Sequence, residues 1–454
     1  MQRYQGIHFY INITNFNQIL LKEEAQTKKV NHAIHALDTF FSSIEAYGKK
    51  LYPKTLVVEK ITGARLHLYV IDDIAQAFQA VKAVSAYAYK LCSFLNSEIA
   101  KYKLLDEFHI NVGVAYGRFY DFEFTTKDGF LETTTIGHAA NYAAKLQTKA
   151  DVSKIAISED IYESLALDEQ AIYQEVSDSS IKKYGHEYYY TTYLGKIASP
   201  IVIQADDMED VKKRANSVNL TDIDFAGVRK PLVFRDLSTT QCKELEGIPV
   251  FADVRDFTSQ FAEDDSNLEE MAQKTQDILS RMYQVSNGHG GIHVQFQGDR
   301  ELSLYHNVPG GVVDGSYVAA VSCYKAAVLA AMRLIDAVKP YSVHIGVGED
   351  FGRLFATRIG AHGEKDNILL GETVIRADYM EDGKAGKDQV AITTEVYTGL
   401  KSEDAALARQ FKKADDGAFV ATIGFAEYTR NLTLAQQQKN TTTGNYNKAW
   451  GDLL

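Results

Sequence analysis

The 454-residue chain has few of the residue types that mark cross-linked, nucleic-acid-binding or linker-rich proteins. Its three cysteines, Cys92, Cys242 and Cys323, are far apart, so neither a disulfide framework nor a thiolate zinc site is indicated. Only 6 prolines are present, which excludes a long proline-rich linker. The net charge is −12, with 48 Lys and Arg against 60 Asp and Glu, which argues against polymeric nucleic acid as the partner.

Long hydrophobic runs are also missing. The most apolar stretch, 317–338, is interrupted by Lys325, Arg333 and Asp336, which is typical of a buried helix and not of a membrane span. The first residues lack the charged-then-apolar layout of a signal peptide. With 45% hydrophobic and 24% charged residues, the sequence predicts a packed cytosolic (cytoplasmic) protein with no membrane insertion.

What the chain does contain is an internal repeat. Four segments recur in the same order about 234–241 residues further on. YINITNFN matches FADVRDFT, and VEKITGARLHLY matches VQFQGDRELSLY. NVGVAYGRF matches HIGVGEDFGRL, and TTTIGHAANYAAKLQ matches NILLGETVIRADYMED. The chain therefore consists of two copies of one unit.

Each copy has the pattern of an alternating strand, a helix, a strand pair with Gly at the hairpin, a long helix, and a further strand and helix. The long helices are expected at about 74–103 and 315–338. This β-α-β-β-α-β order predicts a ferredoxin-like α/β sandwich of the α+β class in each half. The expected division is a first half at 1–195, a connector at 196–245, a second half at 246–430 and a tail at 431–454. The connector is long enough to carry a strand or helix of its own.

These repeated segments resemble the class III nucleotidyl cyclases, in which two catalytic domains associate head to tail and build active sites from both partners. The resemblance implies that the two halves form an intramolecular pseudo-heterodimer. It places Asp253 and Asp299 on the two metal carboxylates of the family, with the Val254 carbonyl as a further ligand. The first half has Asn12 and Ala64 at those positions and so lacks the carboxylates.

The helix that follows the fourth segment shows the opposite loss. The family pattern G-x-x-x-N-x-x-x-R reads Gly137, Asn141 and Lys145 in the first half, so Lys replaces Arg. The second half has Ile375 and Tyr379 instead. Each half keeps what the other has lost, which implies one competent site and one degenerate site.

By this resemblance the site closes a nucleoside triphosphate into a 3′,5′-cyclic nucleotide and releases pyrophosphate, using two Mg²⁺ or Mn²⁺ ions. Asn141 would orient the ribose, and Lys145 would stabilise charge on the α-phosphate. Backbone amides at Phe257 and Thr258 would bind the outer phosphates, and Arg353 matches a triphosphate-binding Arg.

Two positions bear on the nucleobase. Lys60 matches the base-pocket Lys of purine-specific members, whereas Thr134 stands where adenylate cyclases have Asp. The usual guanine-reading Glu and Cys are absent too. Lys60 could donate to the acceptors of a pyrimidine, and the free-standing chain also resembles the bacterial pyrimidine cyclases of antiphage defence (Pycsar type), which signal to a cyclic-nucleotide-binding effector. Cytidine or uridine triphosphate and adenosine triphosphate both remain open as substrates.

A different class of function also stays open. Half of the expected site is already degenerate, so the chain could be a catalytically dead pseudocyclase that binds a nucleotide as a sensor or scaffold. A polymerase-like nucleotidyl transferase shares the two-carboxylate chemistry, but the acidic balance argues against it. One chain can supply both halves of a site, so monomer and homodimer are both permitted.

Overall fold

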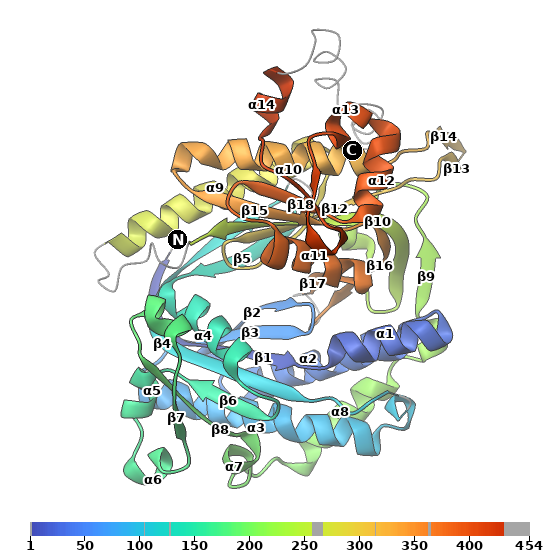
Figure 1. Cartoon of the computed structure of the whole chain (residues 1–454). Helices are drawn as coiled ribbons and strands as arrows, with labels where there is room; N and C mark the ends of the chain where they lie inside the picture. Colours follow the sequence, from blue (N-terminus) through green and yellow to red (C-terminus); the bar gives the residue numbers. More distant parts are fainter. Residues whose placement is uncertain are drawn as a thin grey trace.

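A computed structural model describes residues 2–103, 105–126, 129–256, 267–313, 315–361 and 365–430. Two lobes lie one above the other, the first half at the bottom of Figure 1 and the second half at the top. The first lobe contains β1 (Gln2–Ile13), α1 (Phe16–Thr27), α2 (Asn31–Leu51), β2 (Leu56–Thr62), β3 (Arg65–Val70), α3 (Ile74–Glu98), β4 (Ile110–Thr125), β5 (Leu131–Ile136), α4 (His138–Lys149), β6 (Lys154–Ile157), α5 (Glu159–Glu163), α6 (Leu167–Gln170), β7 (Gln174–Ser177), β8 (Tyr188–Tyr193) and α7 (Leu194–Ala198).

The connector and second lobe follow the same plan. They contain α8 (Ala205–Asn216), β9 (Asp224–Gly227), β10 (Gln241–Arg255), α9 (Leu268–Gly288), β11 (Ile292–Phe296), β12 (Arg300–His306), β13 (Gly311–Val313), β14 (Ser316–Val318), α10 (Tyr324–Val338), β15 (His344–Glu349), β16 (Gly352–Ile359), β17 (Asp366–Leu370), α11 (Glu372–Lys384), β18 (Gln389–Ile392), α12 (Thr394–Glu403), α13 (Ala405–Ala408), β19 (Lys412–Lys413), β20 (Phe419–Ala421) and α14 (Phe425–Arg430).

The strand order confirms the ferredoxin-like prediction for each half. The core strands run β2-β3-β1-β4 in the first sheet and β11-β12-β10-β15 in the second. The pairs within each of these sets are antiparallel. In β1 the alternation of IHFYINI sends Ile7, Phe9 and Ile11 into the core under the helices, and it leaves His8 and Tyr10 on the opposite face.

One predicted element is wrong in its extent. The helix expected at 315–338 begins only at Tyr324, because Gly311–Val318 forms the hairpin of β13 and β14 instead. Val312 and Tyr317, which face each other across this hairpin, are exposed. The apolar run that predicted a longer helix therefore includes a surface hairpin. The first long helix ends at Glu98, close to its predicted end.

Each lobe inserts a two-stranded arm into the other lobe. From β4 and β5 of the first half, Tyr120, Phe122 and Ile136 are buried in the core of the second half. From β16 and β17 of the second half, Phe355 and Ile368 are buried in the core of the first half. Figure 1 shows β17 lying next to β2, and β5 beside the strands of the upper lobe. Because each fully buried side chain of this size contributes about 1.5–3 kcal/mol, the two lobes stabilise each other.

Two glycines at equivalent positions let a helix lie directly on each sheet. A Cβ atom on Gly113 would lie 2.0 Å from the backbone nitrogen of Gln147 in α4, and one on Gly348 would lie 2.1 Å from that of Glu381 in α11. Any larger residue would push the helix away from the sheet. Since α4 carries Asn141 and Lys145, this close packing positions two predicted catalytic residues. No helix among the described residues has the length and hydropathy needed to cross a bilayer.

Candidate active site

The two predicted metal carboxylates lie on adjacent strands of the second lobe. Asp253 is near the end of β10, where it pairs in register with Arg300, the first residue of β12. Asp299 is in the turn just before Arg300, so the pairing brings both carboxylates to one edge of the lobe. Burial, and then the charge of Asp253, raises the pKa of Asp299 well above its usual value. Burial also raises the pKa of Asp253, against the opposing effect of two arginines. A carboxylate pair of this kind favours cations.

Two arginines and the helix α11 surround this pair. Arg255 places Nη1 3.3 Å from Oδ2 of Asp253 and 2.6 Å from Oε1 of Glu381. Arg300 places Nη2 2.9 Å from Oε2 of Glu381, and it also pairs with Asp378. The cluster thus holds four carboxylates and two guanidiniums, an excess of negative charge at the place where the resemblance predicts two divalent cations. Val254, the predicted carbonyl ligand, is buried next to Asp253 in β10.

The structure brings Asn141 of the first lobe to this cluster. A Cβ atom on Gly298 would lie 3.7 Å from Oδ1 of Asn141, so the amide faces the turn that carries Asp299. Lys145 is one helical turn further along α4. Its pKa is lowered, first by burial and then by the charges of Lys149 and Lys183, with an opposing effect from Asp382 of the second lobe. The boundary between the Gly298–Asp299 turn and the helix α4 that carries Asn141 and Lys145 is called the metal seam below.

Lys60 and Thr134, the two residues that the resemblance assigns to the nucleobase, lie together, but all three donors of the Lys60 ammonium are engaged. Its ammonium donates to Oγ1 of Thr134 at 2.5 Å, to Oε1 of Glu132 at 2.8 Å, and across the boundary to the carbonyl of Phe296 at 2.8 Å. Only 3% of the Lys60 side chain is exposed. Since an ammonium has three N–H donors, a nucleobase could receive a hydrogen bond from Lys60 only in place of one of these partners.

Sequence reasoning missed Glu132 and His293, which complete this pocket. Glu132 accepts hydrogen bonds from Lys60, from the Phe296 amide at 2.7 Å and from Nε2 of His293 at 2.8 Å. Burial alone would lower the pKa of His293, but Glu132 and Glu301 raise it to about 9. Neither residue belongs to the family pattern quoted above, so only their contact across the two lobes could identify them.

The structure does not bring Arg353 to the metal seam. Arg353 pairs in register with Glu246, seven residues before Asp253 on β10, which is a separation of about 23 Å along a strand. Its guanidinium contacts Glu244 at 2.7 Å, Glu24 of α1 at 3.2 Å and the Lys28 carbonyl at 2.9 Å. Phe257 and Thr258, the other predicted triphosphate contacts, lie outside the described residues.

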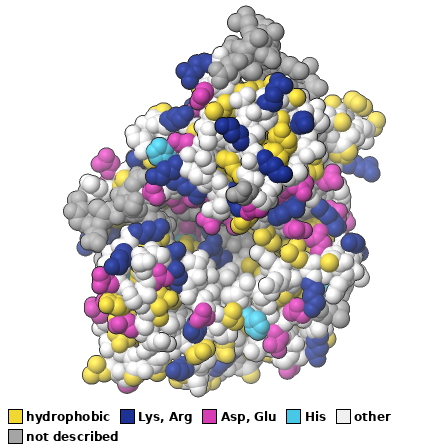
Figure 2. All heavy atoms as spheres, in the orientation of Figure 1, with side chains coloured by type: hydrophobic (Ala, Val, Ile, Leu, Met, Phe, Trp, Pro, Cys, Tyr) yellow, Lys and Arg dark blue, Asp and Glu magenta, His cyan; other side chains and the backbone are white. Residues whose placement is uncertain are grey.

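The equivalent positions with the roles of the lobes exchanged carry the residues expected of a degenerate site. Asn12 donates to Asn111 at 3.5 Å on its own sheet, and Ala64 replaces the second carboxylate. On α11, Ile375 and the half-exposed Tyr379 stand where the first lobe has Asn141 and Lys145. The face drawn in Figure 2 mixes acidic and basic side chains, with no extended basic patch.

Comparisons with known proteins found a matching family model and similar folds. Residues 1–195 match the family model of the adenylate and guanylate cyclase catalytic domain. A class III adenylyl cyclase-like ATP-binding protein from Pseudomonas aeruginosa has a similar fold, with a TM-score of 0.67 at 16% identity over 95% of this chain and 91% of that chain.

Single catalytic domains are also similar to part of the chain. The guanylate cyclase domain of RhGC from Catenaria anguillulae, solved with GTP, is 19% identical over 39% of this chain and 95% of its own, with a TM-score of 0.32. The adenylyl cyclase CyaB from P. aeruginosa is 17% identical over 39% of this chain and 93% of its own, also at 0.32. A search of curated proteins found no match. Residues 1–195 therefore match the adenylate and guanylate cyclase catalytic domain, and the two-lobed fold is similar along its length to that of a class III adenylyl cyclase-like ATP-binding protein.

Proposed function

We propose that the metal seam is a nucleotidyl cyclase site that converts a nucleoside triphosphate into a 3′,5′-cyclic nucleotide and pyrophosphate. The observation that carries the proposal is the position of Asn141 against the Gly298–Asp299 turn. Each lobe alone has only half of the residues that the proposal requires, and Asn141 of one half faces the turn before Asp299 of the other half, which supports the proposal. A protein that acts only as a scaffold would not need the residues kept by one lobe to face those kept by the other.

The donor set fits two Mg²⁺ or Mn²⁺ ions. Carboxylate and carbonyl oxygens are the ligands that these hard cations prefer, and Asp253, Asp299 and the Val254 carbonyl would hold them. The raised pKa values of both carboxylates mean that the folded protein gains from a cation at this place. When bound, the ions supply Lewis acidity that activates the 3′-oxygen and neutralises charge on the phosphates.

The first lobe supplies the groups that act on the reacting atoms. The Asn141 amide is suited to hydrogen-bond the ribose and so align the 3′-oxygen with the α-phosphorus. The Lys145 ammonium is suited to stabilise the negative charge that grows on the α-phosphate, which in a water-excluded site is worth about 3–4 kcal/mol. A lysine is a point charge and not a planar fork, so we expect a looser hold than an arginine would give. Arg353 is left out of the proposed site because its guanidinium is held elsewhere.

For the nucleobase we propose a pyrimidine, as cytidine or uridine triphosphate. The 6-amino group of adenine needs a strong acceptor, and the hydroxyl of Thr134 already accepts from Lys60. A pyrimidine ring is also smaller than a purine ring, so it needs less room beside Lys60, Thr134 and Glu132. A cyclic pyrimidine nucleotide would then signal to a separate cyclic-nucleotide-binding effector, as in antiphage defence.

The test is incubation of the purified chain with each of the four nucleoside triphosphates and Mn²⁺, with products separated by chromatography. We expect a cyclic pyrimidine nucleotide and pyrophosphate. Cyclic AMP as the sole product would overturn the pyrimidine proposal and leave the cyclase proposal standing.

A second candidate, a nucleotide-binding pseudocyclase, is favoured by the fully engaged Lys60 and by the ATP-binding protein to which the fold is similar. The variant Asp253→Ala separates the two. A cyclase loses Mn²⁺-dependent turnover while its fold persists, whereas a pseudocyclase has no turnover to lose in the unaltered chain.

A further inference from the structure

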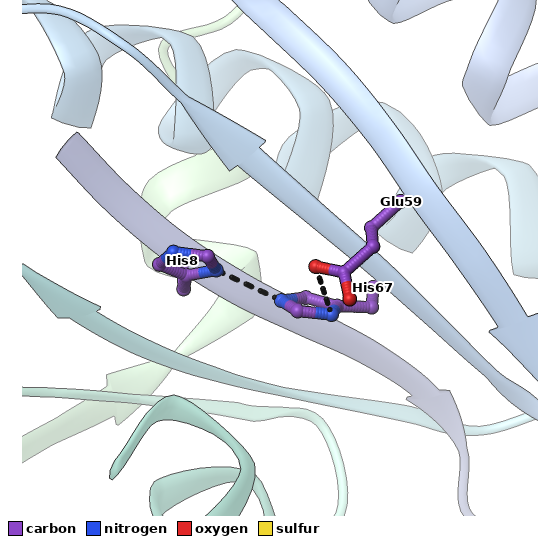
Figure 3. Close-up of side chains that lie close together, drawn as sticks. All are labelled: His8, Glu59 and His67. Carbon is purple, nitrogen blue, oxygen red and sulfur yellow. Dashed lines mark hydrogen bonds and ion pairs between the residues drawn. The ribbon is translucent and has the colours of Figure 1, made fainter. Parts of the chain in front are cut away.

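Three polar side chains form a buried hydrogen-bonded chain on the first sheet (Figure 3). His8 of β1 and His67 of β3 are joined through Nδ1 of His8 and Nε2 of His67 at 2.9 Å. The other nitrogen of His67, Nδ1, lies 2.9 Å from Oε2 of Glu59 on β2. His8 is 0% exposed and His67 is 3% exposed, so water does not screen this chain.

The geometry is that of a chain and not of a chelate. His8 and Glu59 contact opposite nitrogens of the same imidazole, and those two nitrogens point away from each other. A single ion could not bind His67 on both sides. The three residues therefore fix one another's orientation, and Glu59 is the end that acts on its surroundings.

Glu59 in turn holds strand β5. Its Oε1 accepts from the Thr135 amide at 3.1 Å, and its Oε2 accepts from the Thr135 hydroxyl at 2.5 Å. Strand β5 pairs with β4 along one of its edges. The hydrogen bonds of Glu59 connect the other edge of β5 to β2. Lys60 follows Glu59 in the chain and Thr134 precedes Thr135, so this contact sets the spacing of the two predicted nucleobase residues.

The charge of Glu59 also reaches the pocket. Burial would raise the pKa of Glu59, but His67, and after it Lys60 and His8, lower it to about 2. Burial lowers the pKa of His8 to about 3, so this imidazole is neutral. Glu59 is thus a fixed negative charge behind the ammonium of Lys60.

The second lobe shows that the fold does not require a polar chain at this place. Both sheets have a β-bulge here, with Glu59 as the extra residue in one and Val294 in the other. The register partners equivalent to His67 and Thr135 are Leu302 and Leu369. All three residues of the second lobe lie in one apolar cluster. The polar version occurs only in the lobe that carries Lys60 and Thr134.

We propose that Glu59, oriented by His67 and His8, is a positioning residue that sets the distance and charge of the Lys60–Thr134 pair and thereby selects the nucleobase. The inference rests on the proposed function for the identity of the ligand. It concerns which triphosphate is accepted and not the chemistry of ring closure.

The test is the double variant Glu59→Val, His67→Leu, which installs the residues that the second lobe already uses at these positions. The measurement is the dissociation constant of each of the four 3′-deoxynucleoside triphosphates with Mn²⁺, since these compounds cannot cyclise. We expect the ratio between the weakest and the tightest nucleotide to fall at least tenfold. The control variant Leu91→Ala, on the buried face of α3, should lower the melting temperature and keep the ratio.

Three results would overturn the proposal. An unchanged ratio in the double variant would mean that the hydrogen-bonded residues His8, His67 and Glu59 have a purely structural role. A stoichiometric transition metal that is present in the purified protein and lost in the double variant would make His8 and His67 metal ligands. Equal loss of selectivity in Leu91→Ala would make the effect one of general destabilisation. Failure of the proposed function is distinct, because it appears as absent turnover in the unaltered chain whatever the binding ratios are.

Discussion

Replacing Asp299 by Asn should abolish turnover and make the protein more stable at neutral pH. Asp299 is poorly solvated and lies beside Asp253, and both effects raise its pKa. The structure gives it no ion pair with any residue in the described ranges, unlike Asp253, which contacts Arg255. Asn has the same shape without the charge, so the variant removes the repulsion and keeps the turn.

The magnitude and its pH dependence follow from the direction of the pKa shift. An acid whose pKa is raised by folding costs stability above its unfolded pKa, near 4, and that cost disappears as the pH falls below about 4. Leaving a partly desolvated charge without a partner costs about 1–3 kcal/mol. A change of 1 kcal/mol shifts the melting temperature of a large domain by about 2 °C. At pH 7.5 in EDTA, Asp299→Asn should therefore melt about 2–6 °C above the unaltered protein. Near pH 4 the variant and the unaltered protein should melt at the same temperature.

The assay is thermal unfolding with EDTA or with excess Mn²⁺, alongside a cyclase assay. A ligand at a hundred times its dissociation constant adds about 2.7 kcal/mol, so Mn²⁺ should stabilise the unaltered chain and not the variant. Glu349→Gln is a matched control, because Glu349 is a fully buried acid of the same lobe whose pKa is raised by burial to about 8. It should raise stability in the same way and keep both turnover and the response to Mn²⁺. Lower stability of Asp299→Asn in EDTA, or equal stabilisation of both chains by Mn²⁺, would refute the reasoning.

Three further predictions concern residues at the contact between the two lobes. Asn141→Ala should lower kcat by about 10²–10³ with little change in KM, because the amide acts on the transition state, and an equal loss in KM would contradict this role. Lys145→Arg should keep turnover within about tenfold while Lys145→Ala loses about 10² or more, and steady-state kinetics measure both. His293, whose pKa is raised to about 9, contributes stability that is present below pH 6.5 and lost as the pH rises through about 9. Melting curves between pH 6 and 10 should therefore be flatter for His293→Gln, and parallel curves would be inconsistent with a charged His293.

The sequence determined the architecture because the repeat is visible in the residues themselves. Alternating apolar residues in HFYINI, the hairpin glycines Gly63 and Gly298, and the constant spacing predict two βαββαβ units, and the strand order confirms them. The error at 315–338 has a local cause. Apolar residues on a surface hairpin, such as Val312 and Tyr317, have the same composition as a buried helix.

The sequence also shows that the first half lacks an equivalent of Asp253 and that the second half lacks an equivalent of Asn141, because each loss is a change of residue type within a repeated pattern. The sequence does not show that Asn141 lies near the turn that carries Asp299. Asn141 and Gly298 are on different lobes, and only the exchange of arms between the lobes brings α4 to the turn of β11 and β12. The placement of Arg353 depends in the same way on contacts with α1 that no local pattern encodes.

The sequence by itself thus determined which residue types are available, how often the unit occurs and which half lacks which group. The tertiary structure alone decided which of those groups touch. Lys60, Glu132, His293 and Phe296 form one network because strands β2 and β5 of the first lobe come within hydrogen-bond distance of β11 of the second lobe. The physical reason is that backbone pattern is a property of neighbours in the chain, whereas burial, pKa and partner choice depend on atoms that the fold brings from far along the sequence.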